Sequence, residues 1–529
     1  MPVSRRIFRS AWDLHSATGI AVGLALVVFF WGGALALYAD ALRQWERPAE
    51  RVAYAGPVAS VDALVARALD GADVRGETIR VALPTPERPA LAVSWGEEAV
   101  ALDPATGAVL AAQESYVGEL LVQLHALAWD PYSLGMGLAG WIGLVAIVNM
   151  LTGLVIHLKS ARRGGLLRVR PAVRGRALWA DAHRVVGTLV LPFGVALAFT
   201  GALIGIGHVY YFAVTPVALG GDPEGYIGDL GPELTAVATA VGAPVPLRID
   251  PTLGEARATW PDADAEEVII EGAGEAGSVV TVRVREREAL VGGAGDVGHG
   301  LLAVDAATGE ARARVSPSRP YNAGAALWQA MLGVHYGTYG GPLLKALYFA
   351  LALAFCATVV TGQAMWLAAR RRRHPERTVF YDRLGRLTAG VAAGLVPATA
   401  ALFLANKLVP MDLAGRTTWE GAAFYGAWAL AVGAALAAPT PVLAGRRLLV
   451  AGAALCALVP LANGLVTGAW PWTSSASGWD AVFWTDIGFL LAAPLLLLSA
   501  RQLSAEAAPP ASEPRPLSLS PTRTVQTDG

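Results

Sequence analysis

The chain has 529 residues, of which 54% are hydrophobic and only 16% are charged. A soluble protein of this length needs more charged residues to cover its surface, so the composition excludes an ordinary water-soluble enzyme and predicts a membrane protein. The formal net charge of −1 gives no reason to expect a nucleic-acid partner. Cys356 and Cys456 both lie in apolar runs, so no disulfide framework or thiolate metal site is predicted.

Eight apolar runs are long enough to cross a bilayer. The first run is too long for a signal-peptide core and lacks a following cleavage site, so we expect it to be retained as a span. The fold class is therefore a polytopic α-helical membrane protein with about eight transmembrane helices and two small α+β domains outside the membrane. The spans are predicted at about 17–40, 137–158, 184–210, 343–369, 385–405, 422–439, 448–468 and 482–500.

The predicted parts follow one another in chain order. A first span (1–40) precedes a soluble domain (41–120), an outer helix with the second span (121–158) and a basic loop (159–183). The third span (184–210) precedes a second soluble domain (211–330) and the fourth span (331–372). A C-terminal membrane region with the last four spans (373–501) and a disordered tail (502–529) complete the chain.

Basic residues gather in the loops that eight spans place on one side of the membrane. They precede the first span at Arg5, Arg6 and Arg9, and they recur in the loops at 159–176, 370–386 and 446–447. Cytoplasmic loops carry such an excess. We therefore predict a bacterial inner-membrane protein with both termini in the cytoplasm and both soluble domains in the periplasm.

The first 370 residues contain an internal duplication. The pattern H-x-x-x-G starts at His15 and again at His183, and a small pair follows each of them, Gly32-Gly33 and Thr200-Gly201. The turn D-x-x-T-G occurs at 103–107 and 305–309, where we predict β-hairpins, and helices are predicted at 61–69 and 232–241. His125 and His335 precede the second and fourth spans, which contain Thr152-Gly153 and Thr361-Gly362. The repeated unit is a span, an outer α+β domain and a second span.

These features resemble the PepSY-associated transmembrane family. Its members carry H-x-x-x-G in the first span, a periplasmic PepSY module that ends in a D-P-x-T-G-x-V turn, and later spans with H-R-x-x-G and T-G. Here those motifs are His15 to Gly19, Asp103 to Val109, His183 to Gly187 and Thr200-Gly201, and Ala306 replaces the proline of the second turn. The resemblance covers about residues 8–372 and implies two PepSY-like domains. It gives the last four spans no role.

The resemblance also implies a cofactor, because family members include ferric-siderophore reductases and other iron-regulated proteins that hold b-type haem with histidine pairs. Four of the eight histidines occupy equivalent places in the repeat. His15 and His183 would form a cytoplasmic pair, and His125 and His335 an outer pair. Two neutral imidazoles on facing helices make haem iron six-coordinate, which suits electron transfer. We predict two b-type haems with these axial ligands; structural hydrogen bonding by the histidines is the alternative.

Other residues near the histidines have two interpretations each. Arg184 could pair with a haem propionate or be a positive-inside charge. A set of glycines could leave room for a porphyrin or only allow close helix contact, and four aromatic residues could line a docking face or belong to an interfacial belt. His157 and His208 are weaker ligand candidates. The glycines are Gly19, Gly187, Gly201, Gly337 and Gly340, and the aromatic residues are Trp129, Tyr132, Tyr336 and Tyr339.

The sequence carries no phosphate-binding loop, dinucleotide fingerprint or zinc-protease motif. Electrons must therefore come from a separate donor, either a cytoplasmic reductase or the quinol pool. We predict a di-haem electron carrier with oxidoreductase activity that reduces the iron of a periplasmic ferric siderophore. The rival predictions are a membrane-anchored PepSY protein that binds or inhibits a periplasmic protease or another partner, and a transporter.

Overall fold

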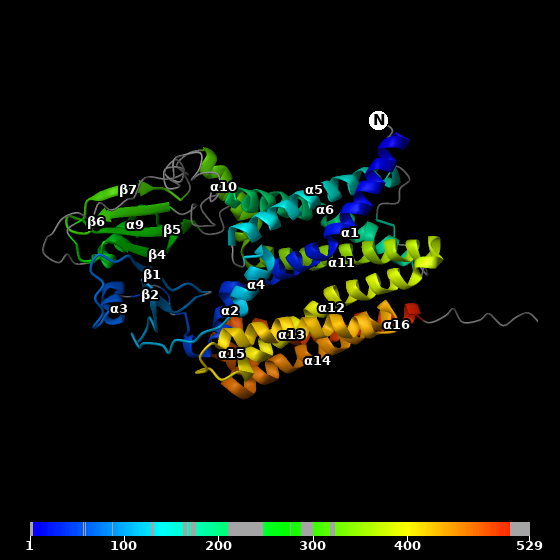
Figure 1. Cartoon of the computed structure of the whole chain (residues 1–529). Helices are drawn as coiled ribbons and strands as arrows, with labels where there is room; N and C mark the ends of the chain where they lie inside the picture. Colours follow the sequence, from blue (N-terminus) through cyan, green and yellow to red (C-terminus); the bar gives the residue numbers. More distant parts are fainter. Residues whose placement is uncertain are drawn as a thin grey trace, which may run out of the picture.

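The computed structural model describes residues 4–507 apart from 55, 57, 59, 87, 129–131, 162–166, 169, 171–175, 210–246, 276, 287–299 and 318–322. Among the described residues, eight helices are long and apolar enough to cross a membrane. These helices lie at one end of the molecule and a β-sheet lies at the other (Figure 1). The predicted polytopic helical membrane protein is confirmed. The helices are α1 (Arg5–Ala36), α5 (Tyr132–Ala161), α6 (Arg176–Val209), α11 (Gly341–Arg373), α12 (Thr378–Leu408), α13 (Arg416–Ala437), α14 (Pro441–Thr467) and α16 (Asp480–Ala507).

The long helices pack as two groups. In the first group, α1, α5, α6 and α11 enclose a cluster that includes Leu26, Met150 and Phe355. In the second group, α12, α13, α14 and α16 enclose another cluster, and the short helices α2 (Ala39–Glu46) and α4 (Val117–Ala126) pack into it. Two further short helices are α10 (Ala323–Tyr336) and α15 (Pro471–Ala476), and single turns of helix lie at Pro48–Glu50, Thr338–Gly340 and Pro375–Arg377. Hydrogen bonding within each helix satisfies the backbone in lipid.

The two soluble segments form one antiparallel sheet. Its seven described strands run in the order β3-β2-β1-β4-β5-β6-β7. The first segment supplies β1 (Ile79–Ala82), β2 (Leu91–Trp95) and β3 (Glu98–Leu102), and the second supplies β4 (Ala263–Glu271), β5 (Val279–Glu286), β6 (Gly300–Asp305) and β7 (Ala311–Val315). The halves join where β1 pairs with β4, with Val81 opposite Val268.

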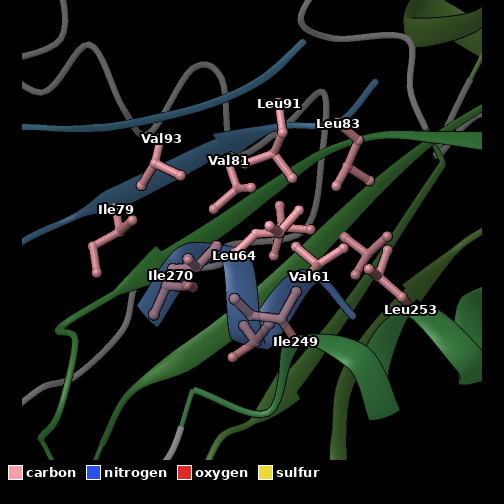
Figure 2. Packing of buried hydrophobic residues seen from close by; sticks show 14 of the residues in the cluster. Val61, Leu64, Ile79, Val81, Leu83, Leu91, Val93, Ile249, Leu253 and Ile270 are labelled. Carbon is pink, nitrogen blue, oxygen red and sulfur yellow. The ribbon is translucent and has the colours of Figure 1, made fainter. Parts of the chain in front are cut away.

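Two helices share one hydrophobic core with the strands of both halves. They are α3 (Val61–Ala68) and α9 (Ile249–Thr259), and residues such as Leu64, Val81 and Ile270 pack together between them and the sheet (Figure 2). The sequence predicted two separate outer domains, and the structure instead joins them. Pairing β1 with β4 satisfies the backbone groups that each half alone would expose at an edge.

The two D-x-x-T-G turns have the same local structure. The carboxylates of Asp103 and Asp305 each accept a hydrogen bond from the backbone N–H two residues later, at 2.9 Å. The glycine that ends each turn has a positive φ of +68° or +77°, which favours glycine. The second turn joins β6 to β7, as predicted, whereas the first leads only to a single bridge between Leu102 and Val109. The predicted helix at 61–69 is α3; the one predicted at 232–241 lies outside the described residues.

Candidate functional site

The structure brings the four candidate histidines together in two pairs. His15 of α1 and His183 of α6 have ring centroids 6.1 Å apart, and each lies in the N-terminal half of its helix. The N-terminus of α1 is at the end of that helix away from the sheet (Figure 1). His125 of α4 and His335 of α10 have ring centroids 5.8 Å apart, and these two helices lie on the side toward the sheet (Figure 1). We call these the distal pair and the sheet-side pair. They are the pairs that the repeat indicated, while the role of the four residues as haem ligands stays a prediction.

Each ring of the distal pair lies against a glycine of another helix. The Nδ1 atom of His15 is 2.8 Å from the carbonyl oxygen of Asn149 in α5, and a Cβ at Gly153 would lie 3.0 Å from the ring. In the second copy, Nδ1 of His183 is 2.8 Å from the carbonyl oxygen of Thr358 in α11, and a Cβ at Gly362 would lie 2.8 Å from the ring. These two glycines therefore leave the space that the imidazoles occupy.

The sheet-side pair repeats this arrangement on α1 and α6. Nδ1 of His125 is 2.8 Å from the carbonyl oxygen of Phe29, and a Cβ at Gly33 would lie 2.8 Å from the ring. Nδ1 of His335 is 2.9 Å from the hydroxyl of Thr200, and a Cβ at Gly201 would lie 3.0 Å from the ring. The Thr200 hydroxyl donates to the helix carbonyl of Ala196 at 2.8 Å, so its oxygen can accept from His335.

The hydrogen bonds at Nδ1 determine the tautomer of the rings. A carbonyl oxygen can only accept, so Nδ1 carries the proton in His15, His125 and His183. The lone pair of a neutral ring then lies on Nε2, which is the nitrogen that can bind a metal. Histidines that bind metals commonly donate their other N–H to a carbonyl in this way, which orients the ring. The Nε2 atoms of these three rings are therefore the nitrogens that can accept a metal, and the use of either pair as a metal site stays a prediction.

A cavity of about 720 Å³ lies beside the distal pair. Both imidazoles line it, together with Gly19, Gly187 and the apolar residues of α1, α5, α6 and α11. Gln363 also lines it; its side chain is 5% exposed, and its Oε1 has no hydrogen-bond partner in the described part of the chain. This volume and a largely apolar lining are common in pockets that bind small organic molecules.

The predicted propionate partner Arg184 has a structural partner. Its guanidinium donates to Asp181 at 3.0 Å and to the backbone carbonyl of Arg168. Asp181 is 1% exposed and also accepts from Arg170 at 3.0 Å. Arg184 nevertheless lines the cavity, as do Arg370 and Arg373. The buried Nε of Arg184 has no hydrogen-bond partner among the described residues. An anionic group could therefore meet a cationic lining.

The predicted glycines divide into two sets. Gly201 lies under His335, and Gly19 and Gly187 line the cavity, so these three belong to the site. The other two allow close packing, because a Cβ at Gly337 would meet Tyr348 and one at Gly340 would meet Leu344. The sequence interpretation missed Gly33, Gly153 and Gly362 as the seats of the imidazoles. The signal was present, since each belongs to a small pair repeated in the duplication.

The weaker candidates lie around the two pairs. His157 lines the cavity. Tyr336 is 44% exposed with its ring 5.6 Å from that of His335, and the Tyr339 hydroxyl is 3.0 Å from that of Tyr348. The side chains of His208, Trp129 and Tyr132 lie outside the described part of the chain.

Two comparisons with known proteins bear on the site. The chain matches the family model described as "PepSY-associated TM region" over residues 12–369, which contain all four paired histidines. It is 32% identical over 407 residues to uncharacterized protein PA4219 of Pseudomonas aeruginosa, covering 74% of this chain and 96% of that protein. Neither description names a cofactor or a substrate.

Proposed function

We propose that this chain, which belongs to the PepSY-associated transmembrane family, is a di-haem electron carrier of the bacterial inner membrane. One b-type haem is held by His15 and His183, and the other by His125 and His335. Electrons enter from a cytoplasmic reductase or from quinol. They leave on the periplasmic side, where the acceptor is the iron of a ferric siderophore.

The separation of the paired imidazoles carries the proposal. Two imidazoles that held one metal through nitrogen bonds of about 2 Å each would have ring centroids about 6 Å apart. The measured separations are 6.1 Å and 5.8 Å. Histidines with a purely structural role have no reason to show this spacing twice, at equivalent places in a duplicated sequence. A haem bound at each pair would supply one-electron redox chemistry.

The distance between the two pairs along α1 and α6 supports a transfer of electrons across the membrane. His15 and Gly33 are eighteen positions apart along α1, as are His183 and Gly201 along α6. At a rise of about 1.5 Å per residue this is about 27 Å, close to the ~30 Å hydrocarbon thickness of a bilayer. The carbonyl partners of His15, His125 and His183 hold these three rings in one tautomer. The pairs can therefore serve opposite faces of the membrane.

The overall reaction balances with either donor. Oxidation of one quinol releases two electrons and two protons, and the two electrons reduce two ferric ions to ferrous ions. A cytoplasmic reductase would supply the same electrons in single steps. Hard oxygen chelators hold ferrous iron less tightly than ferric iron, so reduction releases the metal from a siderophore.

A reduced-minus-oxidised visible spectrum of the purified protein tests the proposal. Protein from haem-replete cells should show a b-type haem band, and His15→Ala and His125→Ala should each remove about half of it, because each leaves one site with a single ligand. His374→Ala is the matched control, since this histidine lies outside both pairs.

Two results would overturn the assignment. Unchanged haem content in both alanine variants would remove the proposed ligands. A colourless wild-type protein would remove any redox role and would favour the partner-binding or transport alternatives.

A further inference from the structure

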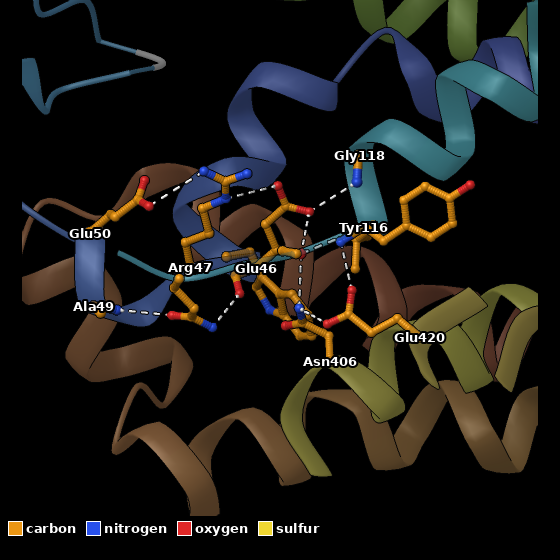
Figure 3. Close-up of polar contacts among 12 residues, drawn as sticks. Glu46, Arg47, Ala49, Glu50, Tyr116, Gly118, Asn406 and Glu420 are labelled. Atoms are coloured by element: carbon orange, nitrogen blue, oxygen red, sulfur yellow. Dashed lines mark hydrogen bonds and ion pairs between the residues drawn. The ribbon is translucent and has the colours of Figure 1, made fainter. Parts of the chain in front are cut away.

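The last four spans lie beyond the family region, which ends at residue 369. The end of α12 and the start of α13 meet α2 and the start of α4 in a buried polar network (Figure 3). The network contains ionisable side chains that are almost completely buried, including Arg416 and Glu420 at 0% exposure and Glu46 at 3%. Burying such groups is costly unless they are paired and hydrogen-bonded, so the network indicates a specific requirement.

Two carboxylates of this network hold the start of α4. One oxygen of Glu420 accepts the backbone N–H of Tyr116 at 2.6 Å, and one oxygen of Glu46 accepts that of Gly118 at 2.9 Å (Figure 3). Tyr116 is the N-cap residue of α4 and makes no side-chain capping bond. The first N–H groups of a helix lack partners within the helix and attract negative charge. The carboxylates of Glu420 and Glu46 give these N–H groups a hydrogen-bond acceptor and place negative charge at the start of the helix.

Glu420 is itself held by the second helix group. Its other oxygen accepts from Asn406 of α12 at 2.9 Å and from Arg416 of α13 at 2.9 Å. Arg416 also donates to the backbone carbonyl of Asn406, which joins the end of α12 to the start of α13. Movement of these two helices would therefore be transmitted to the start of α4.

The other end of α4 carries His125 in its last turn. Between the two ends, Leu120, Leu121 and Leu124 are 0–1% exposed, so the helix is packed along its length. A Cβ at Gly32 of α1 would lie 3.0 Å from the backbone nitrogen of His125, which shows how closely the two helices approach. The ring has little freedom to adjust if α4 shifts.

The same helix group also fixes the seat of His125 on α1. Trp31 donates through its indole N–H to the hydroxyl of Thr399 in α12 at 3.0 Å. Trp31 is two positions from Gly33, against which the His125 ring lies. The His125 ring lies between α4, which carries it, and α1, against which it packs. Helix α12 is connected to both: directly to α1 through Thr399 and Trp31, and to α4 through Asn406 and Glu420.

We propose that the C-terminal helix group is a scaffold that positions His125, with Glu420 and Trp31 as positioning residues for the sheet-side pair. This inference rests on the proposed function. It assigns the last four spans a role in setting the ligand geometry, and hence the redox properties, of one of the two haems. The distal pair is formed by α1, α5, α6 and α11 and makes no use of these contacts in the described structure.

The test uses two substitutions that keep the shape of the side chain. Glu420→Gln places an amide nitrogen where an oxygen accepted from Tyr116, and Trp31→Phe removes the indole donor. Trp428→Phe is the matched control, because Trp428 donates to the Val391 carbonyl within the C-terminal group only. Each substitution is made in full-length protein on the His15→Ala background, where the sheet-side haem remains, and on the His125→Ala background, where the distal haem remains.

Redox titration and the low-spin electron paramagnetic resonance signal should separate the haems. Glu420→Gln and Trp31→Phe should shift the midpoint potential and the resonance signal on the His15→Ala background, and leave both unchanged on the His125→Ala background. Trp428→Phe should change neither. Equal shifts on both backgrounds would indicate a general structural effect and would overturn the inference, as would no shift on either background.

Hydrogen exchange provides a readout that does not depend on haem. Glu420→Gln should raise amide exchange at the start of α4 by about ten-fold or more, because a hydrogen bond to a charged acceptor is lost, while α10 should be unaffected. If the wild-type protein is colourless but Glu420→Gln still raises exchange at the start of α4, the proposed function is wrong and the positioning of α4 by Glu420 still holds. Unchanged exchange in α4 would overturn the positioning of α4.

Discussion

At the residue scale, each of the four histidines depends on a glycine that is distant in the sequence. The glycines lack a side chain at the point where the imidazole lies, and the ring N–H binds the same helix through a carbonyl or a hydroxyl. In three cases the carbonyl belongs to the residue four positions before the glycine. One turn of helix with a missing side chain is therefore the repeated structural unit of the site.

This arrangement predicts the effect of adding one methyl group. In Gly362→Ala the new Cβ would lie 2.8 Å from the His183 ring, so the ring must move away from the Thr358 carbonyl. Under the proposed function, about half of the total haem absorbance should be lost, because the displaced His183 ring could no longer hold a haem at the distal pair. Visible spectroscopy of the purified variant measures this loss.

Gly433→Ala is the control for helix propensity. It also replaces a helical glycine, but a Cβ there meets nothing within 4 Å. Its haem content should equal that of the wild type. Full haem content in Gly362→Ala would show that the ring seat tolerates a side chain and would contradict the prediction.

At the element scale, α3 and α9 stabilise each other through their first turns. The Asp250 carboxylate accepts from the Ser60 hydroxyl and the Val61 N–H, each at 2.7 Å. In return, Asp62 accepts from the N–H groups of Ile249 and Asp250 at 3.0 Å and 2.9 Å. Each helix thus supplies the negative charge that the N-terminus of the other favours. The contact joins the two halves of the sheet domain at a second place besides β1 and β4.

Removal of one carboxylate should weaken both helices. We expect Asp250→Ala to destabilise the sheet domain by about 2 kcal/mol, the upper part of the range for a lost N-cap, since several N–H groups lose their acceptor. Hydrogen exchange in the full-length protein should rise in α3 and in α9. Asp70→Ala, at an exposed position after α3, should leave exchange unchanged; the same exchange in both variants would argue against mutual capping.

At the scale of the whole molecule, two duplicated halves combine in the membrane and outside it. The first copy supplies His15 and His125, and the second supplies His183 and His335, so each pair takes one histidine from each copy. Outside the helices, each copy contributes one part of a continuous sheet. Neither copy alone can complete a histidine pair or the sheet. The position of the sheet therefore depends on how the helices of the two copies pack together.

A disulfide across the junction tests the continuous sheet. Arg80 of β1 lies opposite Ile269 of β4, and directly opposed residues in antiparallel strands have Cα atoms about 5 Å apart, within reach of a disulfide. Arg80→Cys combined with Ile269→Cys should therefore crosslink on oxidation, measured by loss of two thiols to maleimide under denaturing conditions.

The control pair uses the next strand. Thr281 of β5 lies opposite Ile269 on its other side, so it is two strands, about 10 Å, from Arg80. Arg80→Cys combined with Thr281→Cys should keep both thiols free. Crosslinking of the control pair, or none in the first pair, would contradict the strand order.

Several features of this protein followed from the sequence alone. Long apolar runs predicted the membrane helices, because the length of a span depends only on local composition. The duplication indicated which histidines correspond, and the motifs led to the family that the comparison confirmed. Pairing His15 with His183 and His125 with His335 required only that equivalent residues lie at equivalent depths.

Other features were decided only by the tertiary structure. The pairing of β1 with β4, the seating of His183 on Gly362 and the ion pair between Arg184 and Asp181 each depend on how particular elements approach one another. The contact of Glu420 with Tyr116 at the start of α4 joins residues 304 positions apart in the chain. Periodicity and composition describe which residues face inward, but they do not specify which distant residue each one meets.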